Sequence, residues 1–286
     1  MIDNEAIQFY RGNGWLVVED VLSAAQLEHA RQALRGMLDG ARGLTNHDER
    51  YDLEPDHTRD SPRIRRLKSP HKWNSFFDDL MRTPRLLTIF RALIDSPGVR
   101  LLGSKLNIKG PSGGSAIEWH QDWAFDPHTN DAQLAAGVML DDCTNENGAM
   151  LVLPGSHLGP VYDHHADGYF CGAIDLQAAG VNVKTAVACT GKAGSVSFHH
   201  VRTVHGSAVN RSHASRAILF YEVAAVDAWP LSGVANLDEF NGRILVGSPT
   251  ITPRLNDVPV RIPLPPAPQQ GSIYENQLGV KARYFA

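Results

Sequence analysis

The stretch Ile117-Glu118-Trp119-His120-Gln121-Asp122-Trp123 places a histidine and a carboxylate two positions apart, between two tryptophans. Successive side chains of a β-strand point to opposite faces, so we expect His120 and Asp122 to share one face and the tryptophans to occupy the other. Two such side chains on one face can reach a single metal ion. The stretch therefore predicts part of a metal site carried by a β-sheet.

Short apolar runs separated by turn residues lie around this stretch. They occupy residues 99–108, 135–140, 150–153, 181–188, 194–199 and 216–224. This spacing is typical of a double-sheet barrel or jelly roll. We therefore expect a mainly β fold with flanking helices.

The residues on either side of the barrel indicate how the chain is divided. Helices are predicted for residues 4–11, for residues 23–38 with Ser23 as N-cap, and for residues 75–95 with a break at Pro84. The polar residues 41–62 predict a loop. We interpret residues 1–286 as one domain, with a helical part at about 1–97, a barrel at about 98–225 and an irregular, proline-rich segment at 226–286 that wraps the barrel.

Composition excludes several classes of protein. The net charge of -4 and the pI near 6.3 argue against a nucleic-acid-binding protein. No apolar run approaches the ~18 residues that cross a membrane, and the acidic N-terminus does not resemble a signal peptide. The 3 cysteines stand at no metal-ligand spacing. We expect a reduced, cytoplasmic protein that binds a small molecule and neither nucleic acid nor membrane.

A third metal ligand should come from the second histidine-rich region. The candidates there are His199, His200, His205 and His213. Two imidazoles and one carboxylate form the ligand set of non-haem Fe(II) oxygenases, because this set leaves coordination positions open. A 2-oxo acid co-substrate would also need a buried cation for its far carboxylate. Arg216 opens an apolar run where an unpaired charge is unfavourable, and His205 lies 11 residues before it. We therefore favour His205, with His200 as the second candidate.

Four motifs carry a resemblance to a known family. They are Trp119–Asp122, Leu140–Asp142 continued by Glu146–Gly148, Leu153–His157, and His205–Ser207 with Asn210 and Arg216. In these motifs the chain resembles the phytanoyl-CoA dioxygenase family of Fe(II)- and 2-oxoglutarate-dependent oxygenases. The resemblance implies a double-stranded β-helix (cupin-like) barrel, with O2 and 2-oxoglutarate as co-substrates.

The resemblance also implies residue roles. Iron would be held by His120, Asp122 and His205, and Arg216 would anchor the distal carboxylate of 2-oxoglutarate, helped by Ser207 and Lys105. The implied reaction hydroxylates an unactivated C–H bond of a small metabolite and releases succinate and CO2. Halogenating relatives replace the carboxylate ligand with a small residue, so the presence of Asp122 indicates hydroxylation.

One departure from the family pattern lies near the co-substrate. Gly137 stands at a position where the family that this chain resembles has a tryptophan. We expect that part of the pocket wall to be rebuilt by other residues or left open.

The substrate is indicated by a basic run at residues 63–68. This run is either a solvated edge or a cationic wall for an anionic substrate, since arginine pairs well with carboxylates and phosphates. The candidate substrate residues are Arg63, Arg65, Arg66 and Trp123.

Two other functions compete with the oxygenase hypothesis. One is a cupin-like enzyme that holds another metal and does not use 2-oxoglutarate, for which a buried Arg216 would be unnecessary. The other is a non-catalytic protein that senses 2-oxoglutarate or a metal, against which the complete ligand set argues.

Overall fold

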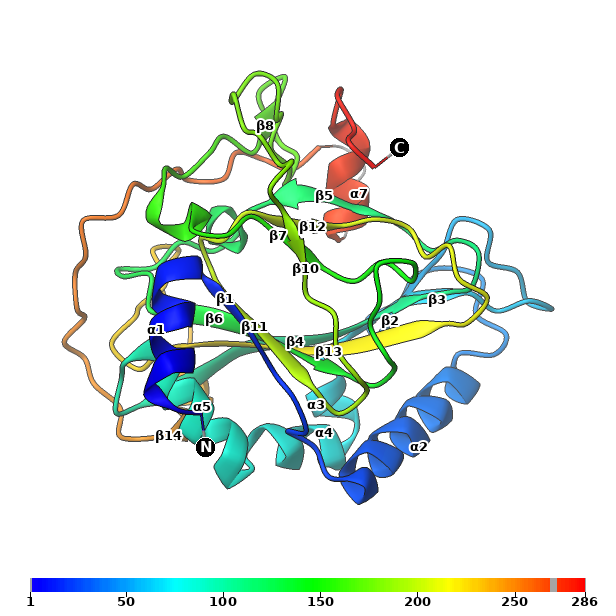
Figure 1. Cartoon of the computed structure of the whole chain (residues 1–286), viewed down its shortest axis with the longest axis horizontal. Helices are drawn as coiled ribbons and strands as arrows, with labels where there is room; N and C mark the ends of the chain where they lie inside the picture. The colour runs from blue at the N-terminus through cyan, green and yellow to red at the C-terminus, as the bar shows by residue number, and fades with distance from the viewer. Residues whose placement is uncertain (1, 268–271, 286) are drawn as a thin grey trace.

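The computed structural model of the chain describes residues 2–267 and 272–285. Two antiparallel sheets face each other, and helices cover the outer side of the larger one (Figure 1). The larger sheet runs in the order β1-β11-β6-β13-β4-β3-β2, with β14 beside β4, and the smaller runs β10-β7-β12-β5. The prediction of a mainly β, two-sheet barrel with flanking helices is confirmed.

The strands of the larger sheet are β1 (Trp15–Val18), β2 (Tyr51–Leu53), β3 (Ile64–Lys68), β4 (Val99–Lys109), β6 (Gln133–Met139), β11 (Val196–His200), β13 (Arg216–Ala225) and β14 (Ile244–Val246). Those of the smaller sheet are β5 (Ile117–His120), β7 (Leu151–Val152), β10 (Val187–Ala188) and β12 (His205–Ser207). A separate hairpin consists of β8 (His165–Ala166) and β9 (Tyr169–Phe170).

The helices are α1 (Asn4–Asn13), α2 (Ala24–Gly40), α3 (Pro70–Trp73), α4 (Ser75–Met81), α5 (Pro84–Ile94), α6 (Leu237–Gly242) and α7 (Ile273–Asn276). Short 3-10 turns are η1 (Asp122–Ala124), η2 (Ser156–Leu158) and η3 (Gln277–Gly279).

Local sequence signals explain where the N-terminal helices begin and end. Ser23 and Gln26 form a capping box at the start of α2, in which each side chain accepts the backbone N–H of the other. The expected break falls between α4 and α5, where Pro84 takes the first position of the new helix. The apolar side of α5 packs on β4 and β13, which form the central antiparallel pair of the larger sheet.

Some expected boundaries differ from the structure. Residues 41–62 contain the strand β2 as well as loop, and most of the basic run forms the strand β3 beside it. Only Val187–Ala188 of the expected run 181–188 is a strand. The apolar pattern of a strand is not visible in β3 because most of its side chains are charged. Some of these charges are paired with the neighbouring strand, as Arg66 is with Asp52 at 2.6 Å.

The C-terminal segment is less irregular than expected, since it contains α6, β14 and α7. After β14, as far as residue 267, it runs as an extended strap around the barrel, in orange in Figure 1. The strap accepts a hydrogen bond at Pro259 O from Trp123 Nε1, at 3.1 Å. After α7, the carboxylate of Glu118 accepts the amides of Tyr284 and Phe285, at 2.9 and 3.3 Å. The strap at Pro259 and the residues after α7 therefore both contact the stretch around His120.

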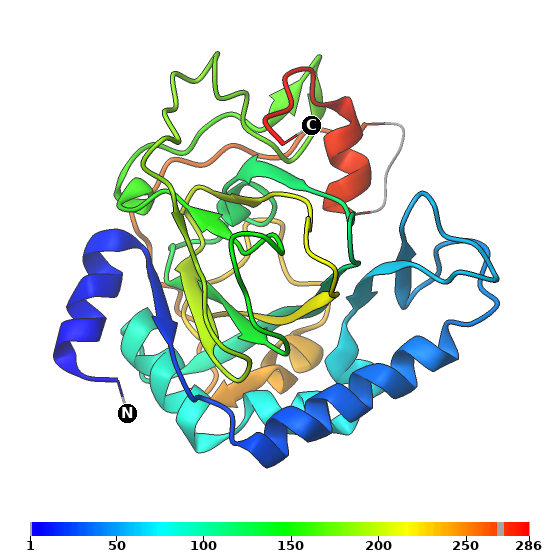
Figure 2. The ribbon, with the colours of Figure 1, turned by 45° about the vertical axis from the view of Figure 1, so that its right-hand side comes forward.

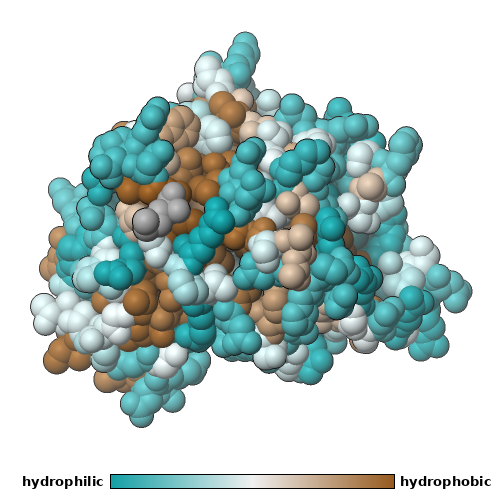
Figure 3. Space-filling model, turned by 60° about the horizontal axis from the view of Figure 1, so that its bottom comes forward, coloured by the Kyte–Doolittle hydropathy of each residue, from teal (hydrophilic) through white to brown (hydrophobic). Residues whose placement is uncertain are grey.

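The position of α2 and the character of one molecular face are seen in two further views (Figures 2 and 3). Figure 2 shows α2 lying along the lower edge of the barrel, away from the smaller sheet. The face in Figure 3 is largely hydrophilic, with hydrophobic groups gathered toward the left of the view. Among the residues described, no helix combines the length and apolar character required to span a membrane.

Candidate active site

Three predicted metal ligands meet between the two sheets. His120 ends β5, Asp122 opens the 3-10 turn η1, and His205 opens β12 directly opposite His120 in the strand register. Asp122 Oδ1 lies 3.6 Å from His120 Nε2 and 3.8 Å from His205 Nε2. The ligand atoms of the three residues all lie within 4.8 Å of one another. The expectation that Asp122 shares a strand with His120 was wrong, because the strand ends at His120 and the following turn delivers the carboxylate.

Backbone contacts aim both imidazoles at the centre of this cluster. His120 Nδ1 lies 2.8 Å from Glu118 O, and His205 Nδ1 lies 2.9 Å from Thr203 O. A carbonyl can only accept, so each Nδ1 carries the proton and each Nε2 presents its lone pair to the cluster. Burial, and then the neighbouring imidazole of His120, hold the pKa of His205 well below its usual value. His205 is therefore the neutral base that a metal ion requires.

The donor set fits a divalent transition metal. Two neutral imidazoles and one carboxylate suit Fe(II), and three protein ligands leave further coordination positions for other molecules. Hydrogen bonds to the backbone orient the two imidazoles, whereas Asp122 comes from the turn η1.

Among the described residues, the other candidates for the third ligand are outside the group of converging ligand atoms. His200 points away from the cluster, toward His157, with its ring centroid 5.2 Å from that of His157. His213 is exposed. His199 approaches from β11 of the facing sheet and places Nε2 3.1 Å from Asp122 Oδ2. Sequence analysis considered His199 only as a metal ligand and missed this contact with the carboxylate.

Two buried cations stand side by side behind the cluster. Lys109 and Arg216 are register partners on β4 and β13, and both are almost fully buried. Lys109 Nζ donates to Ser207 Oγ at 2.8 Å and to Ser207 O at 3.1 Å, and Arg216 donates to the carbonyls of Asn147 and Gly148. Neither cation has a carboxylate partner among the described residues. Adjacent unpaired charges of the same sign are unfavourable, so an anion placed in this corner of the barrel would stabilise both cations.

Lys105, which was expected beside Arg216, has a different position. Its Nζ forms an ion pair with Glu222 Oε1 at 2.6 Å, four residues before Lys109 on β4. Lys109 was missed because Lys105 and Lys109 are four residues apart on β4 and point to the same face. The sequence shows that face but does not show which of the two lysines reaches Ser207.

Two connected spaces adjoin Asp122. The inner one, of about 50 Å³, is lined by the three ligands together with Lys109, Ser207, Arg216 and His199. The outer one, of about 520 Å³, opens toward solvent. Asp122, Lys105 and Arg66 line both spaces, so the three predicted ligands lie where the small inner space meets the wider outer one.

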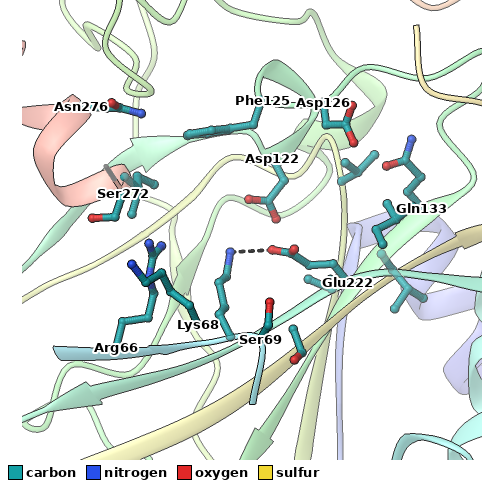
Figure 4. A pocket seen from close by; sticks show the side chains of 18 residues that line it. Arg66, Lys68, Ser69, Asp122, Phe125, Asp126, Gln133, Glu222, Ser272 and Asn276 are labelled. Carbon is teal, nitrogen blue, oxygen red and sulfur yellow. Dashed lines mark ion pairs between the residues drawn. The ribbon is translucent and has the colours of Figure 1, made fainter. Parts of the chain in front are cut away.

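Charged side chains line the outer cavity from opposite sides (Figure 4). Arg66 and Lys68 come from β3, whereas Asp126 and Glu222 lie across from them, and the dashed line marks the pair of Glu222 with Lys105. Ser272, Ile273 and Asn276 of the α7 region form another part of the wall.

The space beside Gly137 is filled rather than open. A Cβ at this position would lie 2.8 Å from Ser197 Oγ and 2.9 Å from Phe220 Cε1. Phe220 and Ile218 of β13 line the inner space here. The wall that a tryptophan provides in the family pattern is therefore rebuilt from β13.

The predicted substrate residues are not all at the cavity. Arg66 lines it, but Arg63 pairs with Asp56 at 3.0 Å and borders a separate surface hollow. Arg65 stacks on Tyr274 and pairs with Glu275 of α7. Trp123 is buried beneath the C-terminal strap. Arg66 is thus the member of this group that faces the cavity.

Comparison with known proteins identifies relatives over most of the chain. The family "Phytanoyl-CoA dioxygenase (PhyH)" matches residues 10–218. A "Probable alpha-ketoglutarate-dependent hypophosphite dioxygenase" of Stutzerimonas stutzeri is 35% identical over 280 residues, which cover 96% of this chain and 97% of the relative. An "L-proline trans-4-hydroxylase" of Streptomyces griseoviridis is 29% identical, with 73% of this chain and 82% of that protein covered.

Solved structures show the same architecture. The crystal structure of EctD from S. alaskensis with 2-oxoglutarate and 5-hydroxyectoine superposes with a TM-score of 0.69 at 25% identity, covering 89% of this chain and 87% of that one. The form of EctD with bound Fe gives a TM-score of 0.68, with 89% and 88% covered. These likenesses confirm the predicted double-stranded β-helix barrel.

Proposed function

The chain belongs to the phytanoyl-CoA dioxygenase family and is an iron- and 2-oxoglutarate-dependent dioxygenase, and from this premise we propose that it oxidises a small phosphorus oxyanion, with hypophosphite as the first candidate. The observation that carries this proposal is the convergence of Arg66, Lys68 and Lys105 on the cavity beside Asp122. The relative from Stutzerimonas stutzeri, named for hypophosphite, directs the choice among oxyanions to phosphorus. The competing sequence hypotheses, a cupin-like enzyme without 2-oxoglutarate and a non-catalytic sensor, are set aside on the same family membership.

We assign the residues as follows. His120, Asp122 and His205 would hold the iron, which when bound supplies dioxygen activation and binds the 2-oxo acid group. Arg216 and Lys109 would hold the distal carboxylate of 2-oxoglutarate, because they are the two cations of the inner space without a carboxylate partner among the described residues. Ser207 is turned toward Lys109 and would orient the same carboxylate.

The outer cavity would hold the substrate. Arg66 and Lys105 line both spaces, so an oxyanion paired with them would lie next to Asp122. One oxygen atom of O2 would enter the substrate and the other would enter succinate, with release of CO2. For hypophosphite, a P–H bond would become P–OH and the product would be phosphite.

A second candidate substrate is favoured by the acidic side of the same cavity. Asp126 and Glu222 face the cations across the space (Figure 4). A small zwitterion would match both sides, with its carboxylate toward Arg66 and its ammonium toward the acids. Hydroxylation would then occur at an unactivated C–H bond, as the sequence analysis expected.

One experiment separates the two candidates. Purified protein supplied with Fe(II), 2-oxoglutarate and O2 is incubated with hypophosphite, an alkylphosphonate or L-proline, and succinate is measured alongside phosphorus NMR of the products. We expect hypophosphite to stimulate succinate release and to yield phosphite. Stimulation by proline alone would replace the first candidate with the second.

A variant pair tests the role of the cationic wall. Arg66→Gln should raise the apparent KM for the oxyanion about tenfold or more, the effect expected when one charged hydrogen bond of at least ~1.5 kcal/mol is lost. Lys184→Gln removes an exposed charge far from the cavity and serves as the control. An unchanged KM in Arg66→Gln would remove the basis for placing the oxyanion on this wall.

A further inference from the structure

We propose that His199 is a positioning residue that acts through Asp122, by holding the carboxylate oxygen that faces away from the predicted metal ligands. The proposal rests on the assignment of the metal centre above. It adds to that centre a third histidine, which is buried and comes from the opposite sheet.

The two oxygens of Asp122 have different surroundings. Oδ1 faces the other ligands, at 3.6 Å from His120 Nε2 and 3.8 Å from His205 Nε2. Oδ2 lies 3.1 Å from His199 Nε2. Because the carboxylate can only accept, His199 Nε2 carries the proton and donates a hydrogen bond to Oδ2. One oxygen is therefore committed to a hydrogen bond and the other is left for the metal.

His199 has little freedom to move from this position. Its side chain is buried, and its backbone pairs with Trp15 of β1 on one side and Ala135 of β6 on the other. Its ring lies 4.3 Å from the ring of His205, centroid to centroid. Among the described residues, Nδ1 has no hydrogen-bond partner. Among the residues that the structure describes, the contact with Asp122 is therefore the one hydrogen bond of this side chain, and it points toward the predicted metal ligands.

This contact has consequences for metal binding. Asp122 stands on a short turn beyond the end of β5, so the strand alone does not fix its rotamer. The Lys105 ammonium is close enough to attract the same carboxylate. A donor at Oδ2 opposes rotation of the carboxylate toward Lys105 and would leave Oδ1 for the metal, with the remaining positions for 2-oxoglutarate and O2. Loss of such outer partners typically lowers metal affinity 10- to 100-fold.

His199 is not itself assigned as a ligand. The atoms that converge within 4.8 Å of one another belong to His120, Asp122 and His205, and His199 is outside that group. Direct coordination by His199 would also release Oδ2 in a buried place without a donor.

The test compares three variants by metal affinity, in the absence of 2-oxoglutarate and substrate. His199→Leu removes the donor, His199→Gln keeps an N–H donor, and His213→Gln changes an exposed histidine as a control. Anaerobic equilibrium dialysis against Fe(II) gives the dissociation constant, and circular dichroism checks that each variant is folded. We expect His199→Leu to bind Fe(II) about 10- to 100-fold more weakly and His199→Gln to recover most of that loss. A second readout is steady-state kinetics, in which both kcat and the KM for 2-oxoglutarate should change in His199→Leu.

The outcomes are separable. If the wild type binds Fe(II) and His199→Leu binds it equally well, the positioning role is wrong while the metal centre stands. If His199→Gln is as weak as His199→Leu, packing rather than hydrogen bonding explains the residue and the proposal also fails. If the wild type itself does not bind Fe(II), both the proposal and the metal centre on which it rests are overturned.

Discussion

Replacement of Lys109 by methionine should weaken binding of 2-oxoglutarate selectively. Lys109 is 2% exposed, its ammonium donates to Ser207 and Ala208, and its neighbour across the strands is the Arg216 guanidinium. Burial, followed by the charge of Arg216, lowers the pKa of Lys109 well below its ordinary value. A bound carboxylate would reverse this penalty, because it supplies the missing opposite charge.

The size of the effect follows from the contacts. A hydrogen bond to a charged group contributes about 1.5–3 kcal/mol, which corresponds to a rise in Kd of roughly 10- to 150-fold. Methionine keeps the length and apolar stem of lysine, so the loss should come from the charge rather than from a cavity.

The assay is isothermal titration of 2-oxoglutarate into anaerobic, Fe(II)-loaded protein. Lys105→Met is the matched control, since it removes a lysine from the same face of β4 that already pairs with Glu222. We expect the control to change the Kd for 2-oxoglutarate by less than about threefold, and the Kd for Fe(II) to be the same in both variants. A Kd for 2-oxoglutarate unchanged in Lys109→Met, or raised more in Lys105→Met, would refute the assignment of Lys109 to the co-substrate.

Three further outcomes are expected. Burial lowers the pKa of His164 to about 3, so as pH falls below ~6.5 the unfolded chain takes up a proton on this residue before the folded chain does. The unfolding free energy should therefore drop by up to about 1.4 kcal/mol per pH unit between those two values. Urea titrations at several pH values should show that the unfolding free energy of His164→Gln depends less steeply on pH than that of the wild type, with His213→Gln as control. Gly137→Ala should lower the unfolding free energy by about 1–3 kcal/mol through overpacking, which thermal unfolding measures, and an unchanged Tm would mean that Phe220 can move aside. Glu222→Gln should free Lys105 and lower the KM for an oxyanion about fivefold, the effect of roughly 1 kcal/mol, whereas a raised KM in steady-state assays would favour the zwitterion.

The convergence of His120, Asp122 and His205 could be predicted from the sequence because each residue carries a short, local signal. The spacing of His120 and Asp122, the late His205, and a charge at the start of an apolar strand each indicate one feature of the site. The structure brings the three ligands together, although by a different local route, since β5 ends before Asp122.

The features that sequence reasoning missed depend on contacts across the barrel. Which lysine of β4 reaches Ser207, and that His199 reaches Asp122 from the other sheet, are set by strand register and not by spacing along the chain. The sequence analysis assigned too many residues of the basic run at 63–68 to the substrate site for a similar reason. Its charges look alike in sequence, but Arg65 is the extra residue where the register of β2 and β3 shifts, and it turns toward α7 while Arg66 keeps to the cavity.

The central claim is that one ferrous ion is held by His120, Asp122 and His205. Anaerobic titration of Fe(II) into the metal-free wild type and into Asp122→Ala tests it most directly, with bound iron counted per chain. The account predicts one tightly bound ion in the wild type and none in the variant. An Asp122→Ala protein that binds iron with wild-type affinity and stoichiometry would contradict it.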